Sequence, residues 1–298
     1  MAVAFRTHSG EPGFSQDYRR IHDFMIRLNQ PVIRTEGFLW GRWEWVNSLP
    51  YFEKEHLNRI GIWEDDGVIV ALATYEQGLG NAWLLLDPNY SELKRDMLLY
   101  AKACLNRDGL ISVLIPDTDR ELQDIAADEG FIPTDEGEKN AVIPIDVSRL
   151  TYALPEGYRI VSLADEFDLH KYNQVLWRGF NHQGDAPDTP DSLEGRRVEL
   201  SGPHVQLELK VAVAAPNGNF VSYCGMWHLP GTDYALVEPV ATDPDYRRMG
   251  LGRAAVLEGV RRCGALGAIR AYVGSSQPFY YSIGFRPHST DTWWKWSK

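Results

Sequence analysis

The sequence contains few cysteines and no long hydrophobic run. Cys104, Cys224 and Cys263 are far apart and odd in number, which argues against a disulfide framework and against a metal-ligand spacing. No stretch of about 18 apolar residues occurs, and Met1–Arg6 lack the apolar region of a leader peptide. We therefore expect a cytoplasmic protein with no membrane partner and no metal.

The chain also lacks an excess of basic residues. It has 30 Lys and Arg against 41 Asp and Glu, a formal net charge of −11. Because nucleic-acid binding needs a broad basic face, this balance argues against a nucleic-acid partner. By contrast, 10 Trp, 14 Tyr and 11 Phe in 298 residues are ample for packed cores, and the length favours two domains of ordinary size.

One stretch combines a strand, a glycine-bearing turn and a helix. Tyr234–Thr242 is an apolar run with β-branched residues, which is typical of a buried strand, and Asp243–Asp245 break it with a turn. Beyond the turn, apolar residues over 254–260 recur at helical spacing. The first N–H groups of a helix have no intrahelical acceptor, and the helix dipole adds partial positive charge there. The stretch therefore predicts an anion site.

The glycines and arginines of this turn strengthen the prediction. Gly250 and Gly252 lack Cβ, so a phosphate oxygen can approach the backbone closely. Arg247, Arg248 and Arg253 add positive charge. The usual phosphate loop is excluded because no Gly-Lys-Ser/Thr follows, and a dinucleotide fingerprint because only two of its three glycines are present.

Two motifs together resemble a known family. Arg247–Gly252 resembles the pyrophosphate-binding motif Gln/Arg-x-x-Gly-x-Gly/Ala of the GNAT N-acetyltransferase superfamily. Phe279–Phe285 resembles the Phe-Tyr-x-x-x-Gly-Phe signature that closes the domain, and it follows at the usual distance. The resemblance implies an α/β fold, in which a mixed, mostly antiparallel sheet is flanked by helices, and an N-acetyltransferase activity with acetyl-CoA as acyl donor.

The resemblance also implies where the donor binds. In the family the sheet splays at a bulged strand, and the pantetheine arm pairs with backbone groups, here those of Val240 and Thr242. The pyrophosphate meets the N–H groups of Arg248 through Arg253. The full expected set is Val240, Ala241, Thr242, Arg247, Arg248, Met249, Gly250, Leu251, Gly252, Arg253 and Ser275. The alternatives are an ordinary loop at the two glycines and solvated surface at Arg247 or Arg248.

Two residues are candidates for proton transfer. Tyr280 is the candidate acid, since a phenol with a pKa near 10 is protonated at neutral pH and can donate to a thiolate. The alternatives are a packing role and the adjacent Tyr281. Glu238 is the candidate base, because burial in an apolar strand would raise its pKa. It lies two residues before Val240, so alternation predicts that both side chains share a face; a counter-ion or structural ion pair is the alternative. His182 and His228 are weaker candidates for the same step.

The first half of the chain repeats the order of the second. Asp87–Tyr90 match Asp243–Tyr246, and Gly130–Pro133 match Gly284–Pro287 at nearly the same separation. In the first copy Ser91–Arg95 contain no glycine, and Ala126 stands where the second copy has Tyr280. We therefore expect two tandem GNAT-like domains: a degenerate copy at 1–145, a linker at 146–157 and the acetyl-CoA domain at 158–298.

Two local expectations accompany this division. The aromatic-rich segment 38–52 is interpreted as a helix or lid packed by aromatics, with a pocket lining as the alternative. Residues 181–192 are rich in Gly, Pro and Asp and are predicted to form a loop.

Two functions remain open from sequence alone. The first is an N-acetyltransferase acting on the amine of a small molecule, as a monomer or homodimer. The second is a non-catalytic acyl-CoA sensor or scaffold, which would need the phosphate cradle but no proton donor. The presence of Tyr280 and Glu238 favours the enzyme. The negative charge favours a cationic acceptor through long-range attraction. The sequence leaves the length of the acyl group open.

Overall fold

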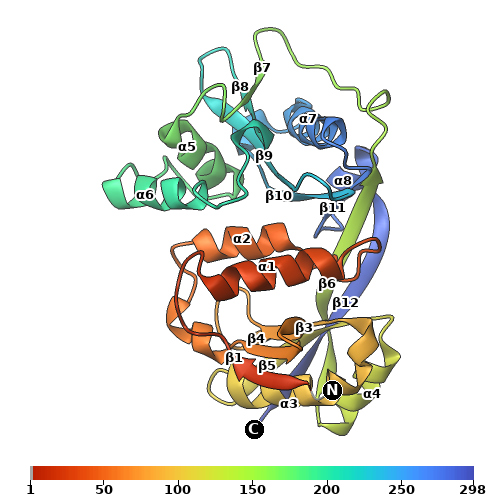
Figure 1. Cartoon of the computed structure of the whole chain (residues 1–298). Coiled ribbons are helices and arrows are strands. Elements are labelled where there is room, and N and C mark those ends of the chain that lie inside the picture. The colour runs from red at the N-terminus through yellow and green to blue at the C-terminus, as the bar shows by residue number, and fades with distance from the viewer. Residues whose placement is uncertain (1–2) are drawn as a thin grey trace. The chain divides into compact units, whose positions relative to one another are not determined.

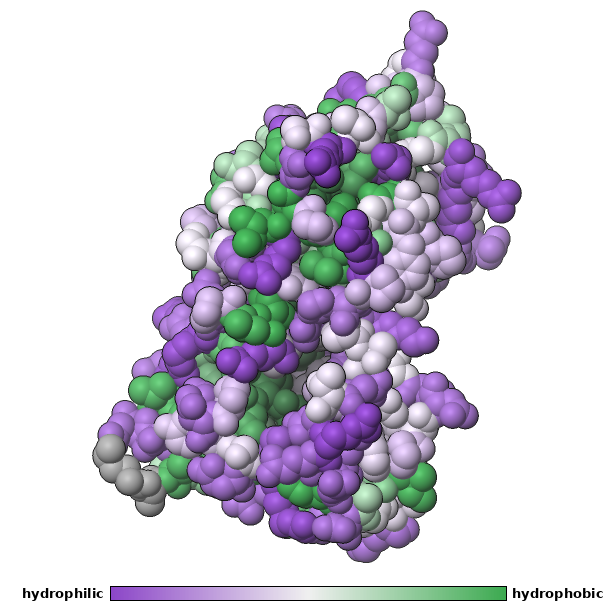
Figure 2. Space-filling model, turned by 90° about the vertical axis from the view of Figure 1, so that its right-hand side faces the viewer, coloured by the Kyte–Doolittle hydropathy of each residue, from purple (hydrophilic) through white to green (hydrophobic). Residues whose placement is uncertain are grey.

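The computed structural model describes residues 3–298, which divide into two units (Figure 1). The first unit runs to Asn140 and also includes Pro287–Lys298; the second comprises Ala141–Arg286. Among the described residues no helix is long and apolar enough to cross a membrane. On the face shown in Figure 2, hydrophilic side chains are interspersed with smaller apolar groups.

The first unit is a sheet with helices packed on it. Its strands follow the order β1-β2-β3-β4-β5-β12-β6, and β4 and β5 pair in parallel, whereas β1–β2, β2–β3, β3–β4 and β5–β12 are antiparallel. Its elements are β1 (Ala4–Thr7), α1 (Gln16–Leu28), α2 (Trp40–Ser48), β2 (Gly61–Asp65), β3 (Val68–Thr74), β4 (Asn81–Leu86), α3 (Lys94–Tyr100), β5 (Leu110–Pro116), α4 (Arg120–Asp128), β6 (Ile132–Pro144) and β12 (Arg286–Ser297).

The second unit has the same plan. Its strand order is β7-β8-β9-β10-β11-β6, with β10 and β11 parallel and the other pairs antiparallel. Helix α7 covers an apolar core on one face, and α5 covers a smaller core on the other. Its elements are β7 (Arg159–Ser162), α5 (Leu169–Gly179), α6 (Pro190–Glu199), β8 (Lys210–Ala214), β9 (Phe220–His228), β10 (Tyr234–Thr242), α7 (Leu251–Ala265), β11 (Arg270–Val273) and α8 (Pro278–Ser282).

The repeated order of elements confirms the internal duplication. In each unit a strand, two helices, three antiparallel strands, a helix, a parallel strand and a short helix follow one another. The matching Asp-Pro turns are also alike: the Asp87 carboxylate accepts from the Asn89 N–H, and the Asp243 carboxylate accepts from the Asp245 N–H, both at 3.0 Å.

The limits of the units differ from the expected 1–145, 146–157 and 158–298 at both ends of the second unit. The second unit begins at Ala141 because the last part of β6 pairs with β11. It ends at Arg286 because β12 pairs with β5 of the first unit. Segment 146–157 packs on the second core through Leu150, Tyr152 and Leu154. The Tyr152 hydroxyl donates to Glu258 in α7 at 2.8 Å. These contacts make the segment a strap of the second unit.

The structure also tests the expectations for segments 38–52 and 181–192. In segment 38–52 the side chains of Trp40 and Trp43 are 1% and 0% exposed, so α2 is packed by aromatics as interpreted. The predicted loop over 181–192 is shorter, because α6 begins at Pro190. The Thr189 hydroxyl caps its first turn, accepting from the Ser192 N–H at 3.2 Å.

Candidate functional site

The second unit's sheet opens beside β10. Strand β10 pairs with β11 only over Tyr234–Leu236, and β11 continues as the partner of β6. Among residues 3–298, no strand pairs with the β11-facing edge of β10 from Val237 to Thr242. Unpaired N–H and C=O groups on a strand edge are available to bind an extended ligand.

A β-bulge lies at the start of this open edge. Val237 is opposite Met226 on β9, whereas Val240 is opposite Cys224, so β10 has one extra residue between them. A Cβ at Gly225 would lie 2.5 Å from the Glu238 carbonyl oxygen, so the bulge requires glycine on the facing strand. The bulge also corrects the sequence argument for Glu238. Val237 and Val240, three residues apart, both contact the α7 core, so simple alternation does not hold here.

The turn after β10 leads into the N-terminus of α7, where the backbone N–H groups face away from the helix. Arg248 and Gly250 have φ of +64° and +82°, and Gly250 is the N-cap. The first intrahelical bond runs from the Ala254 N–H to the Gly250 carbonyl at 3.0 Å. The N–H groups of residues 251–253 therefore have no acceptor within the helix. A Cβ at Gly252 would lie 3.1 Å from Thr242 Oγ1 and fill the space between the strand and the helix end.

A cavity of about 710 Å³ joins the open edge to this helix N-terminus. Nine of the residues expected from sequence line it, eight for the donor and one for catalysis: Val240, Thr242, Arg247, Arg248, Gly250, Leu251, Gly252, Arg253 and Tyr280. The strand-turn-helix stretch thus gathers most of the predicted residues around one space. Its volume is in the range of small-molecule and cofactor sites.

Four expected residues do not line the cavity. Ala241 is buried against α5, Met249 is exposed, and the Ser275 hydroxyl accepts from the Gln277 N–H at 3.2 Å. Glu238 is partly buried, and its carbonyl accepts from Trp227 Nε1 at 2.8 Å.

The three arginines differ in what they contact. Arg247 donates to oxygens of Thr242, Gly179 and Asn181, whereas Arg253 donates to the Thr151 carbonyl of the strap at 3.2 Å. Arg248 is exposed. Arg247 is exposed as well, and Arg253 is partly buried. The positive charge at the cavity mouth therefore comes from Arg248 and from two arginines that also hold the surrounding chain in place.

Tyr280 lies in α8 at the inner end of the cavity. Its side chain is 7% exposed, and its ring packs at 5.0 Å from the Phe279 ring and 5.5 Å from the Phe285 ring. Burial raises the pKa of Tyr280 above its ordinary value, and nearby Cys224 and Glu238 raise it further. Burial also raises the pKa of the Cys224 thiol, which keeps that group neutral at neutral pH. The phenol therefore stays protonated across the physiological range.

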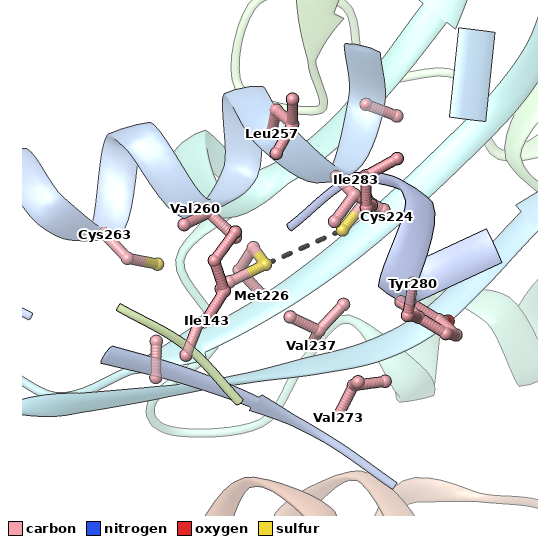
Figure 3. Packing of buried hydrophobic residues seen from close by; sticks show 14 of the residues in the cluster. Ile143, Cys224, Met226, Val237, Leu257, Val260, Cys263, Val273, Tyr280 and Ile283 are labelled. Carbon is pink, nitrogen blue, oxygen red and sulfur yellow. Dashed lines mark hydrogen bonds between the residues drawn. The ribbon is translucent and has the colours of Figure 1, made fainter. Parts of the chain in front are cut away.

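Apolar side chains fill the core next to Tyr280, which itself lines the cavity (Figure 3). Behind Val240 and Tyr280 lie Cys224 and Met226, which are 0% and 1% exposed, with Cys224 Sγ 3.6 Å from Met226 Sδ. A Cβ at Gly259 would lie 2.7 Å from Met226 Cγ, so α7 packs directly on this pair. Helix α7 and strand β9 are therefore in direct contact at this point.

The cavity has a wall that the sequence analysis did not assign. Gly179, Phe180 and Asn181 at the end of α5 line it, as does Phe279 beside Tyr280. No motif marks residues 179–181. A local signal was present at Asn181, whose φ of +65° suits asparagine better than most residues, but such positions are common in loops.

The corresponding place in the first unit is occupied by ion pairs. Lys94 at the start of α3 lies 2.7 Å from an Asp119 carboxylate oxygen and 2.9 Å from one of Glu121. Arg95 pairs with Asp128 and Glu129. Helix α3 is thereby fastened to α4, and the pairing of β4 with β3 over 71–74 runs without a bulge. Residues 91–95, which contain no glycine, thus lead into a salt-bridged contact between two helices.

This combination of a splayed sheet, a bulged strand and an open helix N-terminus defines an acyltransferase-type fold. Residues 173–285 match the family model described as the acetyltransferase (GNAT) family. The chain is 31% identical over 132 residues to a glucosamine 6-phosphate N-acetyltransferase from Trypanosoma brucei brucei, a match that covers 42% of this chain and 86% of that protein. The chain belongs to the GNAT acetyltransferase family.

Solved structures support the tandem arrangement. A tandem GNAT protein from the clavulanic acid biosynthesis pathway matches with a TM-score of 0.62 at 13% identity, over 99% of this chain and 98% of that one. An N-myristoyltransferase from Saccharomyces cerevisiae, solved with bound myristoyl-CoA, matches with a TM-score of 0.56 at 10% identity, over 99% and 80%. At these identities the likeness concerns the fold.

Proposed function

We propose that the second unit transfers an acetyl group from acetyl-CoA to the amine of a small molecule. The observation that carries this is the cavity itself, which leads from the free N–H groups of α7, past the unpaired edge of β10, to the phenol of Tyr280. The two ends have different chemistry. The outer end suits a pyrophosphate, and the inner end offers a neutral hydrogen-bond donor.

The donor contacts follow from this geometry. The pyrophosphate accepts from the N–H groups at the start of α7, with Arg248 and Arg253 adding positive charge. The pantetheine arm pairs with the backbone of Val240 and Thr242, as an added strand would. The packed core next to Tyr280, where Cys224 and Met226 contact Gly259, favours acetyl over a long acyl group.

The reaction needs a neutral amine and a stabilised leaving thiolate. The amine nitrogen attacks the thioester carbonyl carbon, the carbon–sulfur bond breaks, and the sulfur leaves as CoA thiolate. Tyr280 donates a hydrogen bond, and then a proton, to that sulfur. Glu238 takes the amine proton through water, since it does not line the cavity, and its charge acts on Tyr280. Neither step requires a metal.

The acceptor is proposed only as a small-molecule amine. The relative from Trypanosoma brucei brucei is named for glucosamine 6-phosphate, which makes that amino sugar the first acceptor to test. A thiol-release assay with this compound, a polyamine and free amino acids would compare acceptors. Thiol release with none of them would favour the other function, an acyl-CoA sensor without turnover.

The donor site is tested by Gly250→Glu. A carboxylate at this position stands where the phosphate should bind, so acetyl-CoA affinity should fall by at least about a hundredfold in calorimetric titration. Because the φ of +82° penalises any side chain, Gly250→Asn is the matched control. Asparagine tolerates this conformation and adds no charge, so it should lose much less affinity. Wild-type affinity in Gly250→Glu would show that the pyrophosphate binds elsewhere.

A further inference from the structure

The guanidinium of Arg247 is held by three oxygen atoms. Its Nε donates to the Thr242 carbonyl at 3.1 Å, and its Nη2 donates to the Gly179 carbonyl at 3.1 Å and to Asn181 Oδ1 at 2.7 Å. A planar guanidinium with donors in fixed directions can satisfy such a set, whereas a lysine ammonium on a flexible stem cannot reproduce it. Arg247 therefore ties the turn before α7 to the chain that follows α5.

A second arginine makes the reverse connection. Arg178, in the last turn of α5, donates from Nη2 to Asp245 Oδ2 at 3.0 Å and lies 3.5 Å from Asp243 Oδ1. Between the two arginines the backbones are in close contact, since a Cβ at Gly179 would lie 2.5 Å from the Ala241 Cβ and 2.9 Å from the Thr242 nitrogen. The end of α5 is thus fixed to the end of β10 and its turn.

The segment held in this way is a wall of the cavity. Gly179, Phe180 and Asn181 all line it, opposite the residues of α7 and α8. The Phe180 side chain is 46% exposed, so this wall has little core packing of its own. Beyond the contacts of Arg178 and Gly179, its position therefore depends on the polar contacts that Arg247 makes.

We propose that Arg247 is a positioning residue that fixes residues 179–181 as a wall of the cavity, and is not a ligand of the donor's pyrophosphate. The proposal builds on the proposed function. The charge contact to the phosphates then falls to Arg248, which is exposed beside the helix N-terminus. Donor binding at the turn is transmitted through Arg247 to the wall, which becomes more ordered when the donor is bound.

Hydrogen exchange of the whole chain, followed by mass spectrometry, tests the positioning role without any ligand. Arg247→Lys keeps the charge but removes the guanidinium donors that bind Thr242, Gly179 and Asn181. Amides 180–183 should therefore exchange about fivefold faster, the factor typical of one lost hydrogen bond. Asn181→Gly suits the positive φ and removes one acceptor, so it should act in the same direction. Asn181→Asp keeps an acceptor and should retain wild-type protection. The double variant Arg247→Lys/Asn181→Gly should exchange little faster than either single variant, because the two changes break one contact.

Acetyl-CoA then separates positioning from simple stability. In the wild-type chain acetyl-CoA should slow exchange at 180–183, and in Arg247→Lys that slowing should be absent while the affinity for acetyl-CoA stays within about twofold. Arg248→Met should show the opposite pattern, with unchanged exchange at 180–183 and about tenfold weaker acetyl-CoA binding, as expected for a lost charged contact to phosphate. Arg149→Met, which removes an exposed charge of the strap, controls for net charge.

Two results would overturn the proposal. The first is wild-type protection of 180–183 in Arg247→Lys. The second is Arg247→Met weakening acetyl-CoA binding about tenfold with unchanged protection, because that pattern belongs to a phosphate ligand. Failure of the wild-type chain to bind acetyl-CoA would instead count against the proposed function, and the exchange comparison without ligand would still decide the role of Arg247.

Discussion

At the scale of single residues, the environment of Tyr280 decides what its phenol can do. Burial raises its pKa, so the phenol stays protonated while the thioester is intact. It donates only as the carbon–sulfur bond breaks and negative charge gathers on the sulfur. Its contribution therefore grows in the transition state, which is where an interaction accelerates a reaction.

We expect Tyr280→Phe to keep acetyl-CoA affinity within about twofold and to lower the rate of acetyl transfer by about 10²–10³-fold. The ring packing against Phe279 and Phe285 is retained, so the fold should be unaffected. The measurement is steady-state thiol release with the best acceptor, beside calorimetry with acetyl-CoA. Tyr281→Phe is the control for the alternative assignment. Equal rates for Tyr280→Phe and the wild-type chain would remove Tyr280 from the mechanism.

A second residue-scale prediction concerns the first unit. Asp291 is partly buried near Glu36, Glu138 and Asp117, and burial followed by these charges raises its pKa to about 7. The folded state therefore holds a proton that the unfolded chain, with a carboxyl pKa near 3.8, releases. Stability is lost as pH rises from about 4 to 7, because the charged form is disfavoured in the fold.

Asp291→Asn removes that charge and keeps an oxygen for the Asn140 amide, which donates to Asp291 at 3.1 Å. At pH 8 the variant should be more stable than the wild-type chain by about 2 kcal/mol, a value reduced for partial solvent screening. At pH 4 the two should be nearly equal. Urea unfolding at both pH values measures the difference, and a gain of the same size at pH 4 would show that ionisation of Asp291 is not the cause.

At the scale of elements, the packing of α7 on β9 fills the core next to Tyr280, a residue that lines the cavity. Gly259 lets the helix approach Met226, and the Cys224–Met226 pair fills the space behind Tyr280 (Figure 3). The N-myristoyltransferase of similar fold was solved with bound myristoyl-CoA.

We expect acetyl-CoA and propionyl-CoA to bind with similar affinity and octanoyl-CoA to bind at least about tenfold more weakly, since its chain has no space at the inner end. Met226→Ala should narrow that gap by opening a cavity beside Gly259. Competition against a fluorescent CoA analogue gives all three affinities in one assay. Stronger binding of octanoyl-CoA by the wild-type chain would mean that the acyl group leaves the cavity by another path.

Much of the element pattern could be predicted from the sequence, for identifiable physical reasons. The strand Tyr234–Thr242 and the glycine turn were readable because apolar runs and glycines report local backbone needs. The face of the sheet on which Glu238 lies could not be predicted. A β-bulge interrupts the alternation of side chains along β10, and that bulge depends on Gly225 of the neighbouring strand β9. Helix α6 was hidden by a polar sequence whose start depends on the Thr189 cap.

At the scale of the whole molecule, the two units share a fold but differ in what their equivalent helices contact. The limits of the units could not be read from sequence, because strands β6 and β12 are assigned by pairing with distant residues rather than by local pattern. The tandem repeat itself was predictable from the two Asp-Pro turns. What the repeat leaves open is how many donor sites the chain has.

We expect one acetyl-CoA site per chain. In the second unit the N-terminus of α7 is open, whereas in the first the start of α3 is joined to α4 by Lys94 with Asp119 and Glu121. Anion binding there would have to break these ion pairs and face Glu92 as well. Calorimetric titration with acetyl-CoA should therefore give a stoichiometry of one. In Gly250→Glu no site of comparable affinity should remain. A stoichiometry of two, with one site surviving in Gly250→Glu, would show that the first unit also binds the donor and that its salt-bridged helices open to admit it.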